Sequence, residues 1–267
     1  MTHQKLWALC FLIFCADLAC PAHLRADSAT SGLERQIDAV ASRIQTQYPF
    51  KLAYKDFSAK SPLAITYQPA DKKDYRDLLA YLKLFEEEIR KYPKSFFDNA
   101  RLEKVVFVKK FFNGEQPVEG FYARDEHLIF MDFLRSKGNP ITQRHNVHHE
   151  FYHMMEAQMA GDPGRNNPEW ALLNDATFVY RKENVLRQDS AAPFFGFTSE
   201  YAMVSPEEDR AEVYACLLIS SQSKIAHRWM RHDTVLKKKV DYIKMLVHMF
   251  CDEMDAGFWQ IFLNSKK

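Results

Sequence analysis

The sequence predicts an α+β fold, in which a small mixed sheet precedes a histidine-rich helix and a mainly helical C-terminal half. Runs of β-branched and aromatic residues gather between residues 105 and 132, which predicts the strands. Apolar residues at helical spacing dominate the chain on both sides of that region. With 267 residues, 47% of them hydrophobic and 14% aromatic, the chain can bury a sizeable core, as one domain of moderate size or two small ones.

The segment before the predicted sheet is mostly helical. Residues 27–33 are small and polar, which predicts a flexible start. Apolar spacing predicts helices over 33–47 and 71–91, and each ends at a tyrosine–proline pair, because the residue before proline disfavours the helical conformation. A short strand is expected around residues 65–67. The acidic run Glu86-Glu87-Glu88 in the second helix indicates a solvated face.

The remaining elements follow from the same patterns. Strands are predicted over 105–108, 120–123 and 127–132, with a turn at Asn113-Gly114. A helix is predicted over 142–160, where an apolar stripe ends at the stop signal Gly161. Loops are indicated by composition over 161–168 and 188–196. Further helices are predicted over 205–220, 224–231 and 235–263.

The N-terminus has the anatomy of a signal peptide, which we assign to residues 1–26. A short basic start precedes an apolar run, residues 6–19, that is too short for a comfortable transmembrane span. Small residues then favour cleavage after Ala22 or after Ala26. We therefore expect a secreted or periplasmic protein, without a transmembrane helix once the leader is removed.

Cysteine usage leaves alternatives open. Three of the five cysteines lie in the leader. A lipid anchor on Cys20 is the weaker alternative to cleavage, because Asp17 stands where such sites usually carry leucine. Cys216 and Cys251 remain in the mature chain. Either a disulfide, which export permits, or two buried thiols fits them.

The segment His149-Glu150-Phe151-Tyr152-His153 is an H-E-x-x-H match inside the predicted helix 142–160. Residues four apart lie on one helix face, so both imidazoles can reach one metal ion. Zinc suits this set and lowers the pKa of its bound water toward about 7. Glu150 would then take the proton from that water as general base. The alternative is a polar helix with several histidines, and we expect His145 and His148 on other faces, at the surface or as hydrogen-bond partners near the site.

A catalytic zinc site usually has three protein ligands, and the helix predicted over 205–220 is the best supplier of the third. Glu208 and Glu212 are four apart and share one face, so one can bind the metal while the other hydrogen-bonds a histidine ring. An acidic helix N-terminus is the alternative, which fits Glu212 less well because an apolar stretch surrounds it. Asp209 is an alternative ligand, on a face about a hundred degrees from Glu208.

The two motif blocks together resemble a group of zincin metallopeptidases. The second block reads Ser199-x-Tyr201-Ala202, five residues, then Glu208-Asp209-x-Ala211-Glu212. Both blocks look like those of the putative zinc-binding metallopeptidases of bacterial surface and periplasmic proteins. They are more distantly similar to the catalytic domain of anthrax lethal factor and to the Pro-Pro endopeptidases. The serine-to-tyrosine spacing has one extra residue relative to lethal factor, and the chain before residue 101 carries no motif that we recognise.

The resemblance covers roughly residues 100–260 in the order of elements, and it is residue by residue only in the two blocks. It implies His149, His153 and Glu208 as zinc ligands, Glu150 as base, Tyr201 as the oxyanion stabiliser and Glu212 as the residue that orients a ligand. It also implies a zincin-like catalytic domain over residues 102–267. An N-terminal helical region, residues 27–101, would pack on that domain.

We therefore expect an exported zinc metallopeptidase, an endopeptidase rather than an exopeptidase, that acts on protein or peptide substrates. In zinc peptidases of this layout an extended peptide pairs with the open edge of one strand. The alternative is a non-catalytic envelope or secreted protein that uses a zincin fold to bind a partner, although a purely structural site needs no base such as Glu150. A third hypothesis is a signal-anchored adaptor protein that binds no metal.

Charge argues against one further class of partner. The net charge is +1 and no long basic run occurs, so we expect no nucleic-acid partner. The sequence leaves the oligomeric state and the cleavage specificity open.

Overall fold

The computed structural model describes residues 22–55, 57, 65–160, 168–180 and 195–264. The predicted α+β class is confirmed: a small mixed sheet precedes the histidine-rich helix, and the C-terminal half is helical. The helices are α1 (Ala22–Gln47), α2 (Tyr75–Ile89), α3 (Lys94–Ala100), α4 (Pro140–Ala160), α5 (Pro168–Ala171), α6 (Pro206–Leu218), α7 (Ser220–Trp229), α8 (Thr234–Phe250) and α9 (Ala256–Asn264). Two 3₁₀ turns, η1 (Lys72–Asp74) and η2 (Tyr201–Met203), complete the helical elements of the described residues.

The sheet is built around one long strand. The strands are β1 (Lys51–Ala53), β2 (Ile65–Gln68), β3 (Lys104–Asn113), β4 (Gln116–Pro117), β5 (Gly120–Ala123) and β6 (Leu128–Asp132). Strand β3 pairs in parallel with β1 and β6, and its far end pairs antiparallel with β2 and β4. Strand β5 pairs antiparallel with β6 and ends the strand order β1-β3-β6-β5. It is therefore an edge strand.

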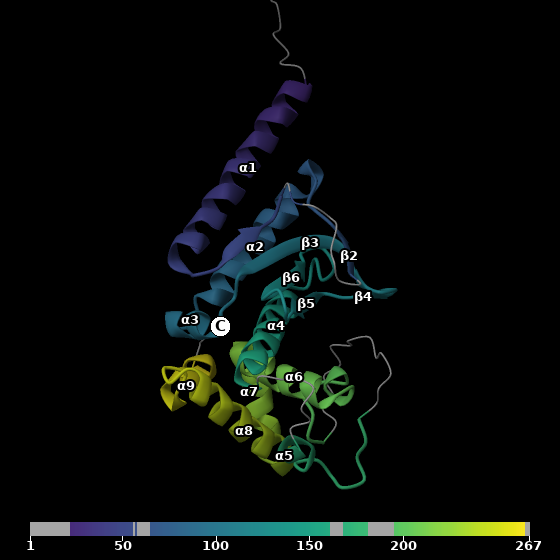
Figure 1. Cartoon of the computed structure of the whole chain (residues 1–267), viewed down its shortest axis with the longest axis vertical. Helices are drawn as coiled ribbons and strands as arrows, with labels where there is room; N and C mark the ends of the chain where they lie inside the picture. Colours follow the sequence, from purple (N-terminus) through teal and green to yellow (C-terminus); the bar gives the residue numbers. More distant parts are fainter. Residues whose placement is uncertain (1–21, 56, 58–64, 161–167, 181–194, 265–267) are drawn as a thin grey trace, which may run out of the picture.

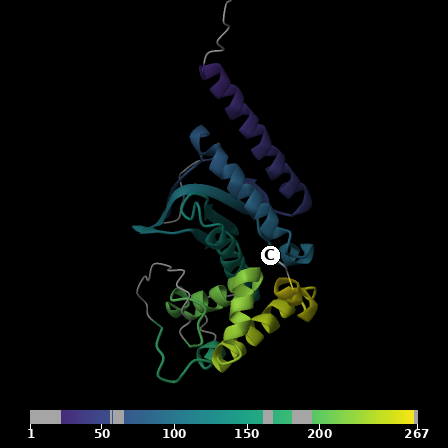
Figure 2. The ribbon, with the colours of Figure 1, turned by 180° about the vertical axis from the view of Figure 1, so that it is seen from behind.

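The two faces of the sheet enter different cores, because side chains alternate along a strand. Val105 and Phe107 of β3 pack into a large core with α1, α2, α3 and α4. Val106 and Val108 face a smaller cluster with Ile65 of β2. Helix α4 packs against α2, α3, β5 and α6. Figure 1 shows α1 and α2 at one end of the molecule, α6 to α9 at the other, and α4 between them, and Figure 2 shows the same order from behind.

The N-terminal part differs from its prediction in α1 and α3, and also in strand β1, which was not predicted. The flexible start predicted for residues 27–33 is wrong, because α1 already begins at Ala22 and runs on to Gln47. This segment contains alanine, leucine and arginine, which favour a helix, and no proline after residue 21. Helix α3 was missed because it is only seven residues long, and it ends at Arg101 in the left-handed conformation (φ 52°).

The single helix predicted over 235–263 is wrong as well. Two helices, α8 and α9, occupy this range, and Cys251 between them is extended (φ −146°, ψ 104°). The apolar period continues across the break, so periodicity alone could not reveal it. The local signal is Asp255, whose Oδ1 accepts a hydrogen bond from the Phe258 N–H at 3.0 Å and so caps α9.

The solvated face predicted for the acidic run in α2 is wrong, because two of its acids are buried. Glu88 is fully buried and Glu86 is 6% exposed, so this stretch is not a solvated face. Cys216 and Cys251 are free, buried thiols, and the Cys251 Sγ lies 3.2 Å from the Ser95 Oγ. Of the two alternatives for these cysteines, the structure has the buried thiols and not the disulfide.

Several predictions from sequence fall outside the described residues. They include most of the leader, residues 1–21, and most of the loops predicted over 161–168 and 188–196. Among the described residues, no helix has both the length and the apolar character that a membrane span requires. The division into regions 27–101 and 102–267 stays a prediction, although side chains from both regions contribute to the large core.

The aromatic cluster around Phe97 links α3 to the chain on both sides of it. The Phe97 ring is fully buried, with centroids 5.2 to 5.5 Å from the rings of Tyr48, Phe50, Tyr92, Phe96 and Phe151. Phe97→Ala should lower the free energy of unfolding by about 3–5 kcal/mol, because it removes ring contacts and leaves a cavity.

Urea denaturation measures this loss, with Met249→Ala as the control. Met249 is 69% exposed on α8, and its replacement should change stability by about 0.5 kcal/mol at most. A loss below about 1 kcal/mol for Phe97→Ala would contradict the packing described here.

Candidate metal centre

Helix α4 carries the first motif block. Asn139 precedes it, and its Oδ1 accepts a hydrogen bond from the Thr142 N–H at 3.2 Å, while Pro140 suits the first turn. His149 and His153 are one turn apart and on one face. Their Nε2 atoms are 3.0 Å apart, and their ring centroids are 4.7 Å apart. The helical spacing therefore brings two metal-binding nitrogens together, as the sequence predicted.

Helix α6 brings a carboxylate to the same point. Ser205 caps this helix by accepting a hydrogen bond from the Glu208 N–H at 3.2 Å, and Pro206 opens its first turn. Because α6 packs along α4, the Glu208 Oε2 lies 2.9 Å from the His149 Nε2 and 3.5 Å from the His153 Nε2. These three side chains form a group whose donor atoms all lie within 4.8 Å of one another.

The donor set fits a zinc ion. The Glu208 Oε2 is buried, and the Nε2 atoms of His149 and His153 face it. Zinc binds nitrogen and oxygen at about 2.0–2.2 Å in tetrahedral geometry, which separates neighbouring ligand atoms by roughly 3.3 Å. The observed separations of 2.9 to 3.5 Å bracket that value. Two imidazoles and one carboxylate, with a position left for water, are a common catalytic zinc set.

The carboxylates and histidines of the group shift one another's pKa values, and each favours the charged form of the other. Burial alone would lower the pKa of His149, but the facing carboxylates of Glu208 and Glu212 outweigh it and raise this pKa well above its ordinary value. Burial would also lower the pKa of His153, but the carboxylate of Glu208 outweighs burial and raises it. Burial would raise the pKa of Glu208, but the two histidines hold it far below its ordinary value. The site is thus a buried anion facing two rings that readily hold protons.

Glu150 lies beside these residues in a closely fitted position. Its side chain is 6% exposed, and burial raises the pKa of its carboxyl group, partly offset by His149 and His153. The backbone N–H of Tyr122 donates a hydrogen bond to this carboxylate. Gly120 on β5 makes room for it, because a Cβ on Gly120 would lie 2.6 Å from the Glu150 Cγ and Oε1. The edge strand therefore fixes where this carboxylate can stand.

A pocket of about 340 Å³ opens onto the group. It is lined by His149, Glu150, His153 and Glu208 and by residues of the edge strand and of the segment before α6, namely Gly120, Phe121, Tyr122 and Tyr201. The Tyr201 ring centroid lies 5.9 Å from that of His149. A phenol at this distance is within reach of a group bound next to the histidines.

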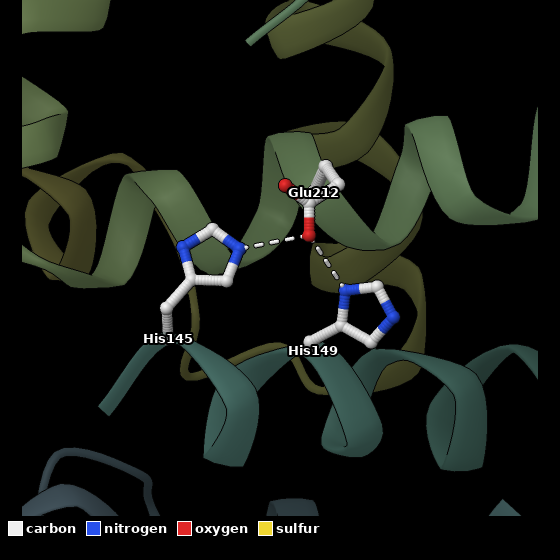
Figure 3. A group of neighbouring side chains, drawn as sticks. All are labelled: His145, His149 and Glu212. Atoms are coloured by element: carbon white, nitrogen blue, oxygen red, sulfur yellow. Dashed lines mark hydrogen bonds and ion pairs between the residues drawn. The ribbon is translucent and has the colours of Figure 1, made fainter. Parts of the chain in front are cut away.

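Glu212 stands one turn behind Glu208 and is 1% exposed. Its Oε1 lies 3.0 Å from the His149 Nδ1 and 3.0 Å from the His145 Nε2, as Figure 3 shows. Its Oε2 accepts a hydrogen bond from the Ser199 Oγ at 2.6 Å. A carboxylate that holds the Nδ1–H of His149 leaves the Nε2 lone pair of that ring for a metal ion.

The structure brings together every site residue singled out from the sequence: Glu150, Tyr201, His149, His153, Glu208 and Glu212. Asp209, the alternative third ligand, lies elsewhere. It is fully buried, and its Oδ2 accepts hydrogen bonds from Lys239, Trp170 and Tyr180 at 2.7 to 2.9 Å. The turn of α6 that directs Glu208 toward α4 directs Asp209 away from it.

Three residues were misjudged or missed by the sequence reasoning. His145 has the expected role of a hydrogen-bond partner near the site, but it is not on another face of α4, since it lies one turn before His149 and shares Glu212 with it. The spacing of four could have revealed that His145 and His149 share a face. His148 does lie on another face, where it is fully buried against Glu88 and Tyr92, each at 2.6 Å. Gly120 gave no signal, because the contact with Glu150 joins distant parts of the chain.

Metal binding at this site should release protons. The facing carboxylates raise the pKa values of His149 and His153, which favours protons on both rings, and a zinc ion can take the ring lone pairs only when those protons leave. The apparent zinc affinity should therefore fall as the pH falls, by up to about tenfold per pH unit for each histidine. Titration calorimetry in buffers of different ionisation enthalpy counts the released protons. An affinity that does not change between about pH 6 and 8 would contradict this charge arrangement.

Comparison with known proteins finds one similar family and one similar solved structure. Residues 130–249, slightly under half of the chain, match the family model described as "Putative zinc-binding metallo-peptidase". No curated protein matches the chain. A solved structure, described as a putative zinc-binding metallo-peptidase from Bacteroides caccae ATCC 43185, matches over 88% of this chain and 95% of its own, with 14% identity and a TM-score of 0.47. The family match includes both motif blocks, so the expected resemblance to the zinc-binding metallopeptidases is confirmed over that segment.

Proposed function

We propose that this chain is a zinc-dependent peptidase that hydrolyses peptide bonds. The observation that carries the proposal is the convergence of His149, His153 and Glu208 in a pocket that also holds Glu150. A structural zinc site is closed by four protein ligands, whereas a catalytic site has three and keeps one position open. The match of residues 130–249 to a family described as zinc-binding metallopeptidases agrees with this proposal.

His149, His153 and Glu208 would hold the zinc ion through their Nε2, Nε2 and Oε2 atoms. Bound there, the ion would supply Lewis-acid chemistry and lower the pKa of a water toward about 7. Glu208 stays ionised because the two histidines lower its pKa, so it offers an anionic ligand across the working pH range.

Glu150 would act as general base and then as general acid. Its carboxylate takes a proton from the attacking water, and the protonated acid then gives that proton to the leaving amine. Burial raises the pKa of this carboxyl group toward neutrality, which suits a group that must both accept and return a proton. Gly120 and the Tyr122 N–H would keep the carboxylate in place during both steps.

Tyr201 would donate its phenol proton in a hydrogen bond to the oxyanion that develops on the substrate carbonyl. Two placements support this role. Tyr201 lines the same pocket as Glu150, and its ring lies 5.9 Å from that of His149. Because the tetrahedral oxyanion is more strongly charged than the substrate carbonyl, a positioned donor stabilises the transition state more than the ground state.

Strand β5 offers a binding edge for an extended peptide. Glu119 directs its carbonyl to the Asp132 N–H of β6, whereas the Tyr122 N–H is directed to Glu150. Because backbone groups alternate along a strand, Gly120 and Tyr122 both face away from β6 and toward the pocket. A peptide paired along this edge would pass the metal ligands with chain on both sides, which favours an endopeptidase.

We also propose that the protein works outside the cytoplasm. The support is the sequence of residues 1–26, with a basic start, an apolar run and small residues at Ala22 and Ala26. Secreted and periplasmic locations both agree with this leader.

Glu150→Gln tests the mechanism. The amide cannot accept the water's proton, so hydrolysis of a peptide library by the purified mature chain should fall by about 10²–10⁴-fold. Zinc should remain bound in stoichiometric amount, because Glu150 is not a ligand. Metal analysis and mass-spectrometric cleavage profiling measure the two outcomes. Retained turnover in Glu150→Gln would overturn the mechanism, and a wild type that holds zinc but cleaves nothing would favour a non-catalytic binding protein.

Gly120→Ala tests whether the edge strand positions the base. The added Cβ displaces the Glu150 carboxylate, and a shift of about 1 Å can reduce kcat by roughly 10²-fold. Zinc affinity should change little, since the ligands are untouched. Gly32→Ala on α1 is the matched control, because a Cβ there meets nothing within 4 Å and should leave activity unchanged. Equal kcat values for both variants would show that Gly120 does not position Glu150.

A further inference from the structure

Helix α4 carries a third histidine in line with the two proposed ligands. His145 is 5% exposed and lies one turn before His149, on the side away from His153. Its Nε2 is 3.0 Å from the Glu212 Oε1, the same oxygen that lies 3.0 Å from the His149 Nδ1 (Figure 3). One buried oxygen atom on α6 thus joins two rings on α4.

The positions of the protons follow from the chemistry of the carboxylate. An ionised carboxylate only accepts hydrogen bonds, so both rings must donate to the Glu212 Oε1. With a metal ion bound, His149 would keep its Nδ1 proton and direct its Nε2 lone pair to the site of Glu208 and His153. His145 carries a proton on Nε2. Its Nδ1 lies 2.8 Å from the amide of Gln222 on α7, which can present either an oxygen or an NH₂ group to it.

Three donors fix the orientation of Glu212. Ser199 donates to Oε2, and the two histidines share Oε1. A carboxylate that is 1% exposed is costly to bury unless each oxygen is satisfied. Without His145, Oε1 would lose one of the two ring donors that lie on either side of it.

We propose that His145 is a positioning residue of the metal centre. It holds Glu212 in the orientation that fixes the ring plane and the proton position of His149, and so it raises the affinity of the site for zinc. The inference rests on the proposed zinc site, but it concerns metal affinity and requires no peptide hydrolysis. His145 touches neither the metal nor the substrate.

The same three side chains also form a group that could hold a metal ion themselves. The chemistry of His149 argues against this use. His149 would have to bind two ions through its two nitrogens and lose its remaining proton, and Glu212 would lose the hydrogen bonds that both rings donate to it. One zinc ion per chain is therefore the expected stoichiometry.

The test compares zinc affinities of the full mature chain by competition with a chromophoric chelator. His145→Leu removes the donor and should weaken zinc binding about tenfold, the lower end of the effect of losing a partner that orients a ligand. His145→Gln keeps an N–H group that can reach Glu212 and should restore most of the affinity. Thermal unfolding of each metal-free variant, followed by circular dichroism, shows that the compared proteins are folded.

His148→Gln is the matched control on the same helix. His148 is as deeply buried and as fully hydrogen-bonded as His145, but its partners are Glu88 and Tyr92. This variant should lower the thermal stability of the metal-free chain and leave zinc affinity unchanged. A merely structural role for His145 predicts the same pattern for His145→Leu.

Four outcomes would overturn the proposal. They are wild-type affinity in folded His145→Leu, equal weakening in the leucine and glutamine variants, equal weakening in His148→Gln, and two zinc ions per wild-type chain. Zinc alone is the probe, so a chain that binds zinc but cleaves no peptide refutes the proposed function and leaves this inference standing. Conversely, an active peptidase whose zinc affinity is the same with and without His145 refutes only the inference.

Discussion

The packing of α4 against α6 is the interaction on which the rest of this molecule depends. Both helices carry their polar residues at a spacing of four, so each presents one row of them to the other. The rows interdigitate in the order His145, Glu212, His149, Glu208, His153, with 2.9 to 3.5 Å between successive partners. Each carboxylate stands between two rings, and each oxygen that faces the rings contacts two nitrogens. A rotation of either helix would separate all of these contacts at once.

Buried polar groups on the outer sides of the two helices resist that rotation. On α4, Arg144 contacts the fully buried carboxylate of Glu88 on α2. On α6, Asp209 accepts a hydrogen bond from Lys239 of α8, whose Nζ also donates to the Gly196 carbonyl at 2.7 Å. Burial raises the pKa of Asp209 to about 6, although Lys239 opposes the rise. Such buried pairs are costly, and their geometric demands specify one orientation of each helix.

Most of the local structure could be predicted from the sequence, because it depends on neighbours along the chain. The edge strand 120–123 and the ends of α2, α4 and α6 lie within a few residues of their predicted places. The wrong predictions arose where contacts between distant parts of the chain override the local apolar pattern. The apolar pattern continues through Cys251, yet helix α8 ends there. The acids of α2 have the pattern of a solvated face, but Glu86 and Glu88 are buried in the folded protein. The short helix α3 depends on the aromatic cluster around Phe97, which joins segments far apart in sequence.

For the candidate site, the sequence by itself determined which residues share a helix face. His149 with His153 and Glu208 with Glu212 follow from the 3.6-residue turn alone. Only the tertiary structure decided which of Glu208 and Asp209 faces α4, because the rotation of α6 depends on contacts with Lys239 and Trp170. Only the tertiary structure could show that Gly120 gives Glu150 its space, and that His145 shares an oxygen of Glu212 with His149. The physical reason is that a local pattern fixes the direction of a side chain from its own helix, whereas its partners are set by how distant segments pack.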